Sequence, residues 1–223
     1  MLLLPESGSL VRQDEERNDD SSKASLPGRR RGSNSRLPSL ATLGRINLRF
    51  INKDHHGGLH KAVLNGSESE VESLISAGKD IDAHDEYGKT PLHCAVGAQK
   101  LDIVQCLLRY KPEVDAHDDR EDTPLHTATR TGNVEIVLAL LRDGHANPNT
   151  AGNSGCTALH IAAHLDHANN VSICKILLQH NAKILARDHK SMTPIAHAAL
   201  HGSYDVMVCL FQHCKLKTHE TVD

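Results

Sequence analysis

Residues 118–150 show a pattern of polar and apolar positions that predicts two short helices separated by turns. Residues 118–122 are polar, as expected of a turn, and a second helix is predicted from about Val134. The apolar stripes are Leu125, Ala128 and Thr129 in the first helix and Ile136, Val137, Leu140 and Leu141 in the second. Neither helix can bury its apolar face alone, so such units must stack on copies of themselves.

The ends of these two helices carry recognisable capping residues. Thr123 can supply an N-cap oxygen, and Pro124 follows at the first helical position, where its missing N–H costs nothing. Gly132 suits a positive φ at the end of the first helix. Gly144 is predicted to close the second helix in the same way.

The start of the first helix recurs along the chain. Thr90, Thr123, Thr157 and Thr193 begin copies that are 33, 34 and 36 residues apart. Leu59 lies 33 residues before Leu92 and marks a further copy without the Thr-Pro start. Self-similarity at this period indicates a repeat array. The copies read Thr90-Pro91-Leu92-His93-Cys94-Ala95, Thr123-Pro124-Leu125-His126-Thr127-Ala128, Thr157-Ala158-Leu159-His160-Ile161-Ala162 and Thr193-Pro194-Ile195-Ala196-His197-Ala198.

These copies closely resemble the ankyrin repeat family in their Thr-Pro-Leu-His-x-Ala motif, the glycine between helices and the Ile-Val-x-x-Leu-Leu of the second helix. The resemblance implies an all-α repeat solenoid of about five repeats, each a helix-turn-helix plus a β-hairpin finger. It also implies protein binding on a concave face formed by fingers and inner helices. The predicted domain is 54–217, with repeats at about 55–85, 86–117, 118–150, 151–187 and 188–215, and a short tail at 218–223.

Departures from the family pattern distinguish the individual repeats. Repeat one lacks the Thr-Pro start and has Glu70 where isoleucine is expected, as in an N-terminal cap. In repeat two, Gln99 replaces the glycine between the helices. Repeat four has three extra residues around 167–170 and closes with Asn181, which tolerates a left-handed conformation. Repeat five has Ala196 in the histidine position.

Residues 1–53 differ in composition from the repeats. They are rich in serine, arginine, glycine and proline with few apolar residues, which predicts a disordered tail. Arg30-Arg31-Gly32-Ser33 fits the Arg-Arg-x-Ser pattern of basophilic kinases, so Ser33 is a candidate phosphorylation site. The alternative is a solvated basic linker that is never modified. Residues 29–31 make a poor nuclear-localisation signal because no second basic cluster accompanies them.

Composition and charge exclude several classes of protein. No Trp, three Tyr and two Phe are too few for an aromatic core, which favours small and branched residues packed between repeats. A net charge of −3 favours neither nucleic acid nor an acidic membrane surface, and no apolar run reaches the ~18 residues of a membrane span. Six cysteines without framework spacing predict reduced, inert thiols. We expect a monomer located in the cytoplasm or the nucleus.

Seventeen histidines raise the question of metal binding or catalysis. The family resemblance implies a structural role for those at the motif position, which hydrogen-bond the neighbouring finger: His60, His93, His126 and His160. His84 and His117 each stand beside an aspartate, but two residues on separate fingers are too few for a metal site. The cysteines fall in helix cores without a base and an orienting residue. We therefore expect no catalytic residue, metal or cofactor.

The charges of the fingers change along the array. The second and third fingers are mostly acidic, whereas the last carries Arg187, His189 and Lys190. A surface that runs from acidic to basic would favour a partner with the opposite gradient. The competing interpretation is that aspartates in these turns serve backbone hydrogen bonds.

The function predicted from these observations is a non-enzymatic adaptor that binds an unidentified protein on the concave face. Tyr87 stands out as an aromatic residue at a finger tip, where it can anchor an interface or pack on the next finger. The predicted partner-binding residues follow the motif register: Glu86, Tyr87, Lys89, Asp119, Arg120, Asp122, Arg130, Thr131, Asn153, Ser154, His164, His189, Lys190 and Met192.

Two alternatives stay open. The first is a regulator or inhibitor of a transcription factor or kinase, which the residues do not distinguish from an adaptor. The second is a substrate-recognition subunit of a ubiquitin ligase, which would need a ligase-binding box after the repeats. The sequence runs only to residue 223, so we expect no such box here.

Overall fold

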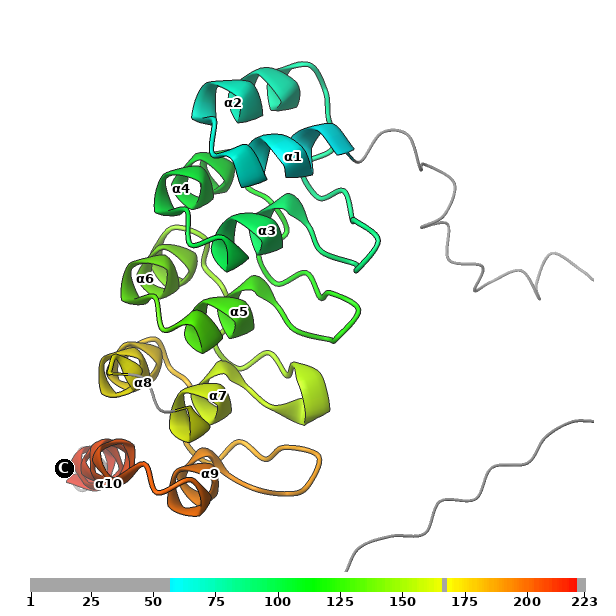
Figure 1. The fold of residues 1–223 in the computed structure, drawn as a ribbon. Coiled ribbons are helices and arrows are strands. Elements are labelled where there is room, and N and C mark those ends of the chain that lie inside the picture. Colours follow the sequence, from blue (N-terminus) through cyan, green and yellow to red (C-terminus); the bar gives the residue numbers. More distant parts are fainter. Residues whose placement is uncertain (1–56, 166–167, 220–223) are drawn as a thin grey trace, which may run out of the picture. The chain divides into compact units, whose positions relative to one another are not determined.

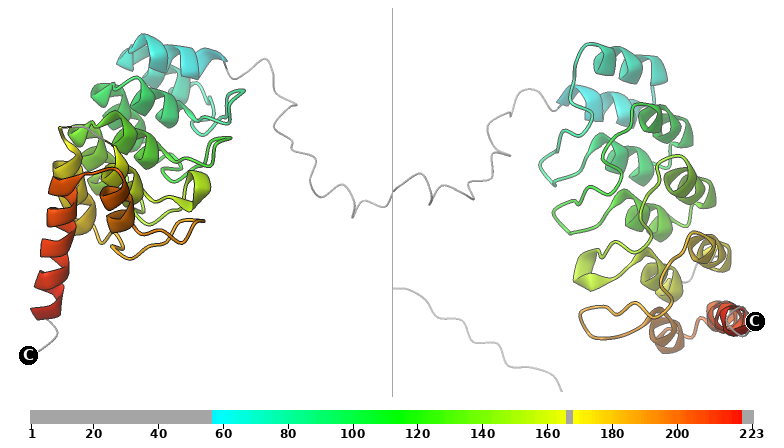
Figure 2. Two further views of the ribbon diagram at one scale, coloured as in Figure 1. Left: turned by 60° about the horizontal axis from the view of Figure 1, so that its bottom comes forward. Right: turned by 180° about the vertical axis from the view of Figure 1, so that it is seen from behind.

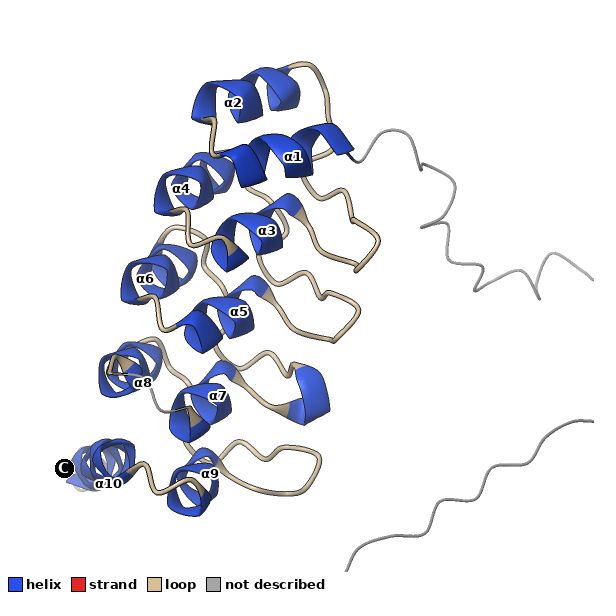
Figure 3. Cartoon of the chain, viewed as in Figure 1, coloured by secondary structure: helices blue, strands red, loops and turns tan. Residues whose placement is uncertain are grey.

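The computed structural model describes residues 57–165 and 168–219, with side chains described as far as residue 214. Its helices confirm the predicted all-α solenoid (Figure 3). They are α1 (Gly57–Asn65), α2 (Glu68–Ser76), α3 (Pro91–Gly97), α4 (Leu101–Arg109), α5 (Pro124–Thr131), α6 (Val134–Arg142), the 3₁₀ turn η3 (Asn153–Gly155), α7 (Ala158–His164), α8 (Asn170–Gln179), α9 (Pro194–Leu200) and α10 (Tyr204–His219). The predicted tail at 1–53, with Ser33, lies outside the described residues.

The helices stack in two columns (Figure 1). Helices α1, α3, α5, α7 and α9 form the inner column, and α2, α4, α6, α8 and α10 form the outer column. The loop before each inner helix from α3 onward projects to the side as a finger (Figure 2). Each repeat therefore contributes one inner helix and one outer helix, as the repeat pattern predicts.

The core between the columns is built from small and branched residues at repeated positions. Leu125 of α5 is 1% exposed and Leu140 of α6 is 0% exposed, and both belong to one continuous cluster that runs through all five repeats. Alanines of the inner helices, such as Ala95 and Ala128, are fully buried where neighbouring repeats meet. The shortage of aromatic residues is therefore no obstacle to a packed core.

Threonine and histidine together begin the inner helices. At the start of α3, the Thr90 hydroxyl accepts a hydrogen bond from the His93 amide at 3.4 Å, and the His93 ring accepts one from the Thr90 amide at 3.2 Å. Thr123 and Thr157 occupy the same N-cap position. This reciprocal arrangement is a capping box in which histidine replaces the usual glutamate.

Left-handed residues turn the chain between the inner and outer helix of most repeats. Gly132 ends α5 with a φ of 70°, as predicted, and Gly202 has the same φ in repeat five. In repeat two, Gln99 occupies this position with a φ of 55°. A side chain with a Cβ is therefore held in a conformation that favours glycine.

The predicted role of Gly144 is wrong. The left-handed residue after α6 is His145, with a φ of 54°, whereas Gly144 is not left-handed. A Cβ on Gly144 would lie 2.8 Å from the Leu140 carbonyl oxygen and 3.0 Å from a Leu108 side-chain carbon. Gly144 is therefore required for close packing, and the extra residue at this turn accounts for the 34-residue spacing after Thr123.

The fingers are hairpin-like turns, because no β-strand occurs among residues 57–165 and 168–219. The Asp85 amide donates to the Lys89 carbonyl oxygen at 2.9 Å, and the Asp118 amide donates to that of Asp122 at 3.0 Å. These single rungs are too short to form the β-hairpins that the resemblance implied. The last helix, α10, continues to His219, four residues beyond the predicted end of repeat five.

Candidate protein-binding surface

We call the surface formed by the fingers and the inner helices the inner face. The motif histidines join each inner helix to the finger of the next repeat, as the family resemblance implied. Their ring Nε2 atoms donate hydrogen bonds to carbonyl oxygens of that finger. The pairs are His60 with Lys89 at 2.9 Å, His93 with Asp122 at 3.1 Å, His126 with Cys156 at 3.0 Å and His160 with Met192 at 3.1 Å.

Three of these histidines are held in one tautomer. The ring Nδ1 of His93, His126 and His160 accepts from the amide of the N-cap threonine, so the proton sits on Nε2. Burial lowers the pKa of all three rings below the ordinary value, although the hydrogen bonds to finger carbonyls act in the opposite direction. The neutral rings therefore act as fixed struts that hold the fingers in place.

Several finger aspartates serve the backbone. The Asp85 carboxylate accepts from the amides of Tyr87 and Lys89 at 2.9 and 2.8 Å. Asp118 and Asp188 make the same pair of bonds in the third and fifth fingers. These carboxylates close their own turns, so fewer acidic groups are available to a partner than the sequence suggests.

Other acidic residues link successive loops behind the fingers. The Asp82 carboxylate accepts from the Glu113 amide at 2.8 Å, and Asp115 accepts from the Asn147 amide at 3.1 Å. The proposed change from acidic to basic fingers is therefore weaker on the surface than in the sequence.

Arg130 and Asp122 form an ion pair on the inner face. The Arg130 Nη2 atom lies 2.9 Å from a carboxylate oxygen of Asp122. Asp122 is only 4% exposed, whereas the Arg130 side chain is 46% exposed. The Asn153 amide donates to the other Asp122 oxygen at 3.3 Å. Asp122 was predicted to contact a partner. Because it is buried beneath Arg130, it instead orients the Arg130 side chain.

Tyr87 and Asp119 lie where the second and third fingers meet. Tyr87 is 62% exposed. Its backbone carbonyl oxygen accepts a hydrogen bond from the Asp119 amide at 3.0 Å. The Asp119 carboxylate lies over Gly88, where a Cβ would approach it to 2.4 Å. Gly88 has a φ of 69°, so glycine is needed there for both space and conformation.

The fourth and fifth fingers are joined in a similar way. The His189 amide donates to the Ser154 carbonyl oxygen at 3.0 Å, and His189 packs on Gly155. The Asn153 side chain donates to the Arg120 carbonyl oxygen at 3.0 Å and so ties the fourth finger to the third. Neighbouring fingers therefore form a connected edge.

The remaining predicted residues are distributed along the inner face. Four of them, on fingers, are exposed: Glu86, Lys89, Arg120 and Lys190. Three are half-buried: Thr131, His164 and Met192. The structure thus brings the predicted residues together in two regions. The first comprises fingers two and three with Arg130, and the second comprises fingers four and five with His164.

Imidazole rings gather beside the second region. His164 of α7 lies with its ring centroid 5.9 Å from that of His197 on α9 and 5.4 Å from that of His201, the residue after α9. Burial lowers the pKa of His164, and the neighbouring histidine rings act in the same direction. His197 and His201 were not predicted as site residues. Their spacing of four on a helix that packs against α7 was the available signal.

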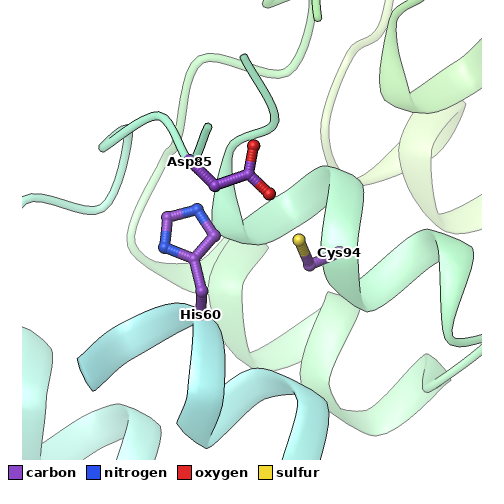
Figure 4. A group of neighbouring side chains, drawn as sticks. All are labelled: His60, Asp85 and Cys94. Carbon is purple, nitrogen blue, oxygen red and sulfur yellow. The ribbon is translucent and has the colours of Figure 1, made fainter. Parts of the chain in front are cut away.

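Three groups of metal-ligand side chains also come together that the sequence analysis did not identify. In each, the donor atoms lie within 4.8 Å of one another. Figure 4 shows one group, in which His60, Asp85 and Cys94 converge from α1, the second finger and α3. The other two are Cys156 with Asp188 and His197, and Glu68 with Glu72 and Cys106.

All six cysteines are free. Burial raises the pKa of the Cys174 thiol to about 12 and that of Cys94 to about 11, and the neighbouring Cys209 thiol and Asp85 carboxylate, respectively, add to the effect. Thiols with raised pKa values are poor nucleophiles. The predicted inert, reduced state fits these surroundings.

A shallow depression of about 570 Å³ lies on the outer helices α4 and α6, away from the fingers, and is lined by polar and charged residues such as Gln105 and Arg109. Among the described helices, none has both the length and the apolarity needed to cross a lipid bilayer.

Comparison with known proteins agrees with this architecture. A family model described as ankyrin repeats in three copies matches residues 59–151 and 144–220. The neurogenic locus notch homolog protein 1 of Danio rerio is 35% identical over 137 residues, which are 61% of this chain and 6% of that protein. Inversin of Gallus gallus is 30% identical over 156 residues, which are 70% of this chain and 11% of that protein. The chain thus matches a small part of each of these relatives.

Stacked helix pairs, left-handed turns and fingers bridged by histidine define a helical repeat protein. The family model covers most of the chain, and the chain belongs to the ankyrin repeat family. Ankyrin repeats are generally protein–protein interaction modules.

Proposed function

We propose that this protein is a non-enzymatic adaptor that binds a protein partner on its inner face. The observation that carries the proposal is the Arg130–Asp122 pair, in which a buried carboxylate holds an exposed guanidinium in one orientation. A cation fixed before binding loses little side-chain entropy when a partner arrives. Arg130 is therefore suited to receive an acidic group of the partner.

The exposed Tyr87 supplies the apolar part of the same region. Tyrosine and arginine are the residue types most often found at the centres of protein interfaces. Glu86, Lys89 and Arg120 surround it on the finger tips. The partner would present a carboxylate to Arg130 and an apolar surface to the Tyr87 ring.

Fingers four and five extend the proposed interface. Asn153 and Ser154 are exposed at the tip of finger four, and His189 and Lys190 are exposed at the tip of finger five. The positive charge of Lys190 favours an acidic segment of the partner at this end. In this proposal Thr131, His164 and Met192 line the interface. Asp119 and Asp122 position neighbouring residues and do not themselves provide the binding energy.

The proposal assigns the protein no catalytic activity, no catalytic cofactor and no oligomeric partner of its own kind. Its support is chemical, because the buried thiols have raised pKa values and the motif histidines use their ring nitrogens as struts. A cytoplasmic or nuclear location, and regulation through phosphorylation of Ser33, are further parts of the hypothesis. Both depend on the tail sequence rather than on the repeats.

Site-specific photo-crosslinking tests the interface directly. A photoreactive amino acid is placed at Tyr87 on the inner face and, as a control, at Gln105 on α4, where the side chain is exposed on the outer column. We expect a specific protein to crosslink from position 87 in native extract and not from position 105. Crosslinking from position 105 alone would place the interface on the outer helices and contradict the proposal.

The partner found in this way is then measured with purified proteins. We expect the double variant Tyr87→Ala/Arg120→Glu to lose most of its affinity, while Lys175→Glu, an equal charge reversal on α8, retains it. Circular dichroism must first show that both variants fold. Binding that survives the double variant but disappears on deletion of residues 1–53 would move the function into the tail. The identity of the partner decides between an adaptor, a regulator and a ligase subunit.

A further inference from the structure

A group of three different metal-ligand types lies at the junction of repeats four and five. Cys156 follows the fourth finger, Asp188 begins the fifth finger and His197 lies on α9. One sulfur, one carboxylate oxygen and one ring nitrogen of these residues lie within 4.8 Å of one another. The group therefore connects two successive repeats.

The Asp188 carboxylate is held in a defined orientation. Its Oδ1 accepts hydrogen bonds from the amides of Lys190 and Met192 at 2.9 and 2.8 Å, which fix the turn of the fifth finger. Its Oδ2 lies 2.9 Å from Nε2 of His197. The side chain is 4% exposed, so one oxygen of a buried carboxylate faces the imidazole.

His197 is also held in place, and its hydrogen bonding is incomplete. The side chain is only 14% exposed, and its Nδ1 is buried without a hydrogen-bond partner among the described residues. Its Nε2, by contrast, faces the Asp188 carboxylate, so the two ring nitrogens lie in different surroundings. The ring lies beside a carboxylate and a thiol, the two other side-chain types that bind zinc.

The neighbouring histidines differ in their availability as ligands. His160 lies edge-on to His197, with 5.3 Å between ring centroids, but both of its nitrogens already bond to Thr157 and Met192. His164 bonds through Nδ1 to the His160 carbonyl oxygen, which leaves its Nε2 for another ligand. His164 is nevertheless not among the side chains whose ligand atoms gather here, so a fourth ligand position is left to water.

The other two groups are less suited to a metal ion. Arg109 bonds to both Glu68 and Glu72, so a cation already occupies those carboxylates beside Cys106. In the group drawn in Figure 4, the His60 ring forms the strut to the Lys89 carbonyl oxygen. Its carboxylate, from Asp85, is half-buried, whereas that of Asp188 is buried.

We propose that Cys156, Asp188 and His197 bind one zinc ion, which cross-links repeats four and five. Thiolate, imidazole and carboxylate are the three ligand types that proteins offer to zinc. Bonds of about 2.0–2.3 Å place neighbouring ligand atoms roughly 3.3–3.8 Å apart. His197 Nε2 and Asp188 Oδ2, which are 2.9 Å apart, must therefore separate slightly, while the Cys156 sulfur adjusts from its position within 4.8 Å of them. The half-buried Cys156 side chain can make this movement.

Coordination also moves protons. Burial, together with the nearby Asp188 and Asp122, raises the pKa of the Cys156 thiol, so zinc must displace the thiol proton to solvent. The ion takes the position between His197 Nε2 and Asp188 Oδ2 that a proton holds in the metal-free protein. The ring proton of His197 moves to Nδ1. Zinc would thus stabilise the last repeat against fraying.

Cobalt spectroscopy and calorimetry on the purified, metal-free full chain test this site. We expect one Co²⁺ to bind per chain with a sulfur-to-cobalt charge-transfer absorption, and one Zn²⁺ to displace it. Cys156→Ser should abolish that absorption, and both Cys156→Ser and His197→Gln should weaken zinc binding at least about 100-fold. Zinc should raise the melting midpoint of the unmodified protein and not of either variant.

Cys94→Ser is the matched control, because Cys94 belongs to the equivalent group between repeats one and two. We expect this variant to bind zinc like the unmodified protein. No binding by the unmodified protein, unchanged binding by Cys156→Ser, or a loss confined to Cys94→Ser would each overturn the assignment. Should His197→Gln fail to fold by circular dichroism, the nearly isosteric Cys156→Ser decides the outcome.

Discussion

The guanidinium of Arg130 lies 2.9 Å from a carboxylate oxygen of Asp122, which is buried beneath it. Exposed ion pairs contribute about 0–1 kcal/mol, but removing one partner of a buried pair costs about 3–5 kcal/mol. The contribution of the Arg130–Asp122 pair to stability should lie between these two ranges, because only its carboxylate is buried. Its strength therefore bears on both stability and binding.

Replacing Arg130 with alanine should lower the free energy of unfolding by about 1–2 kcal/mol, because the Asp122 carboxylate loses its counter-ion while it stays buried. Urea denaturation measures the change. Arg120→Ala is the control, since Arg120 is exposed, and should shift stability by less than about 0.5 kcal/mol. Equal losses for the two variants would show that the ion pair adds nothing.

Leu140→Ala should cost about 2–5 kcal/mol, because this residue is 0% exposed between α6 and its neighbours. We expect a similar loss for Leu141→Ala, which is 4% exposed. Leu185→Ala removes the same atoms from a residue that is 71% exposed, and should be nearly neutral. Thermal unfolding of the three variants makes the comparison, and a neutral Leu140→Ala would contradict the stacked core.

Gln99→Gly should stabilise the protein by about 0.5 kcal/mol. The φ of 55° at Gln99 costs an L-residue about 1 kcal/mol, which outweighs the extra freedom that glycine gains in the unfolded chain. Gln105→Gly is the matched control, because it makes the same substitution inside α4 and should destabilise by about 1 kcal/mol. A lower melting midpoint for Gln99→Gly would refute this explanation.

Stability should fall as the pH is lowered from 7.5 to 5.5. The pKa values of His93, His126 and His160 are lower in the folded protein than the ordinary 6.5, so the unfolded chain binds protons first. The contribution of these rings is complete above pH 6.5. It is lost progressively as the pH falls from there towards the folded-state values.

Urea denaturation at several pH values tests this dependence. His126→Gln should be less stable at every pH and should show a smaller loss between pH 7.5 and 5.5. His145→Asn changes an exposed histidine at a left-handed position that asparagine accepts, and should leave the pH dependence as it is. A stability that rises on acidification would contradict the assigned direction of the pKa shifts.

Local signals predicted the fold well. The stripe through Leu125 and Leu140, with the caps at Thr123 and Gly132, depends only on residues close in the sequence. The roles of the motif histidines came from the family resemblance, which gave a hydrogen bond to the neighbouring finger, and the structure identifies the carbonyl oxygen that accepts it. Repetition made these predictions robust, because the same signals occur in several copies.

The errors have physical reasons. Gly144 and His145 are adjacent, and the pattern alone cannot decide which of them adopts the left-handed conformation when one residue is inserted. Asp122 is acidic in a finger, which suggests exposure, but Arg130 and the amide of Asn153 make its burial possible. The Asn153 contact comes from the next repeat, and the Arg130 contact joins a finger to the helix that follows it, so neither follows from the apolar pattern of one helix.

The grouping of Cys156 with Asp188 and His197 was missed for a related reason. Asp188 and His197 are nine residues apart, as are Asp85 and Cys94, and this spacing recurs at the same place in the repeat. This nine-residue spacing could have identified two of the three ligands from the sequence of one repeat. The third ligand comes from the preceding repeat, so only the stacking reveals the full set.

The histidine struts give the array a polarity. In every bridge the donor belongs to the earlier repeat and the acceptor to the later one, and Ala196 ends the series. Removing the last repeat would expose the His160 ring nitrogen to water, and removing the first would do the same to the Lys89 carbonyl group. A further repeat added after the fifth would meet no such donor, so extensions at that end should begin by restoring histidine at position 196.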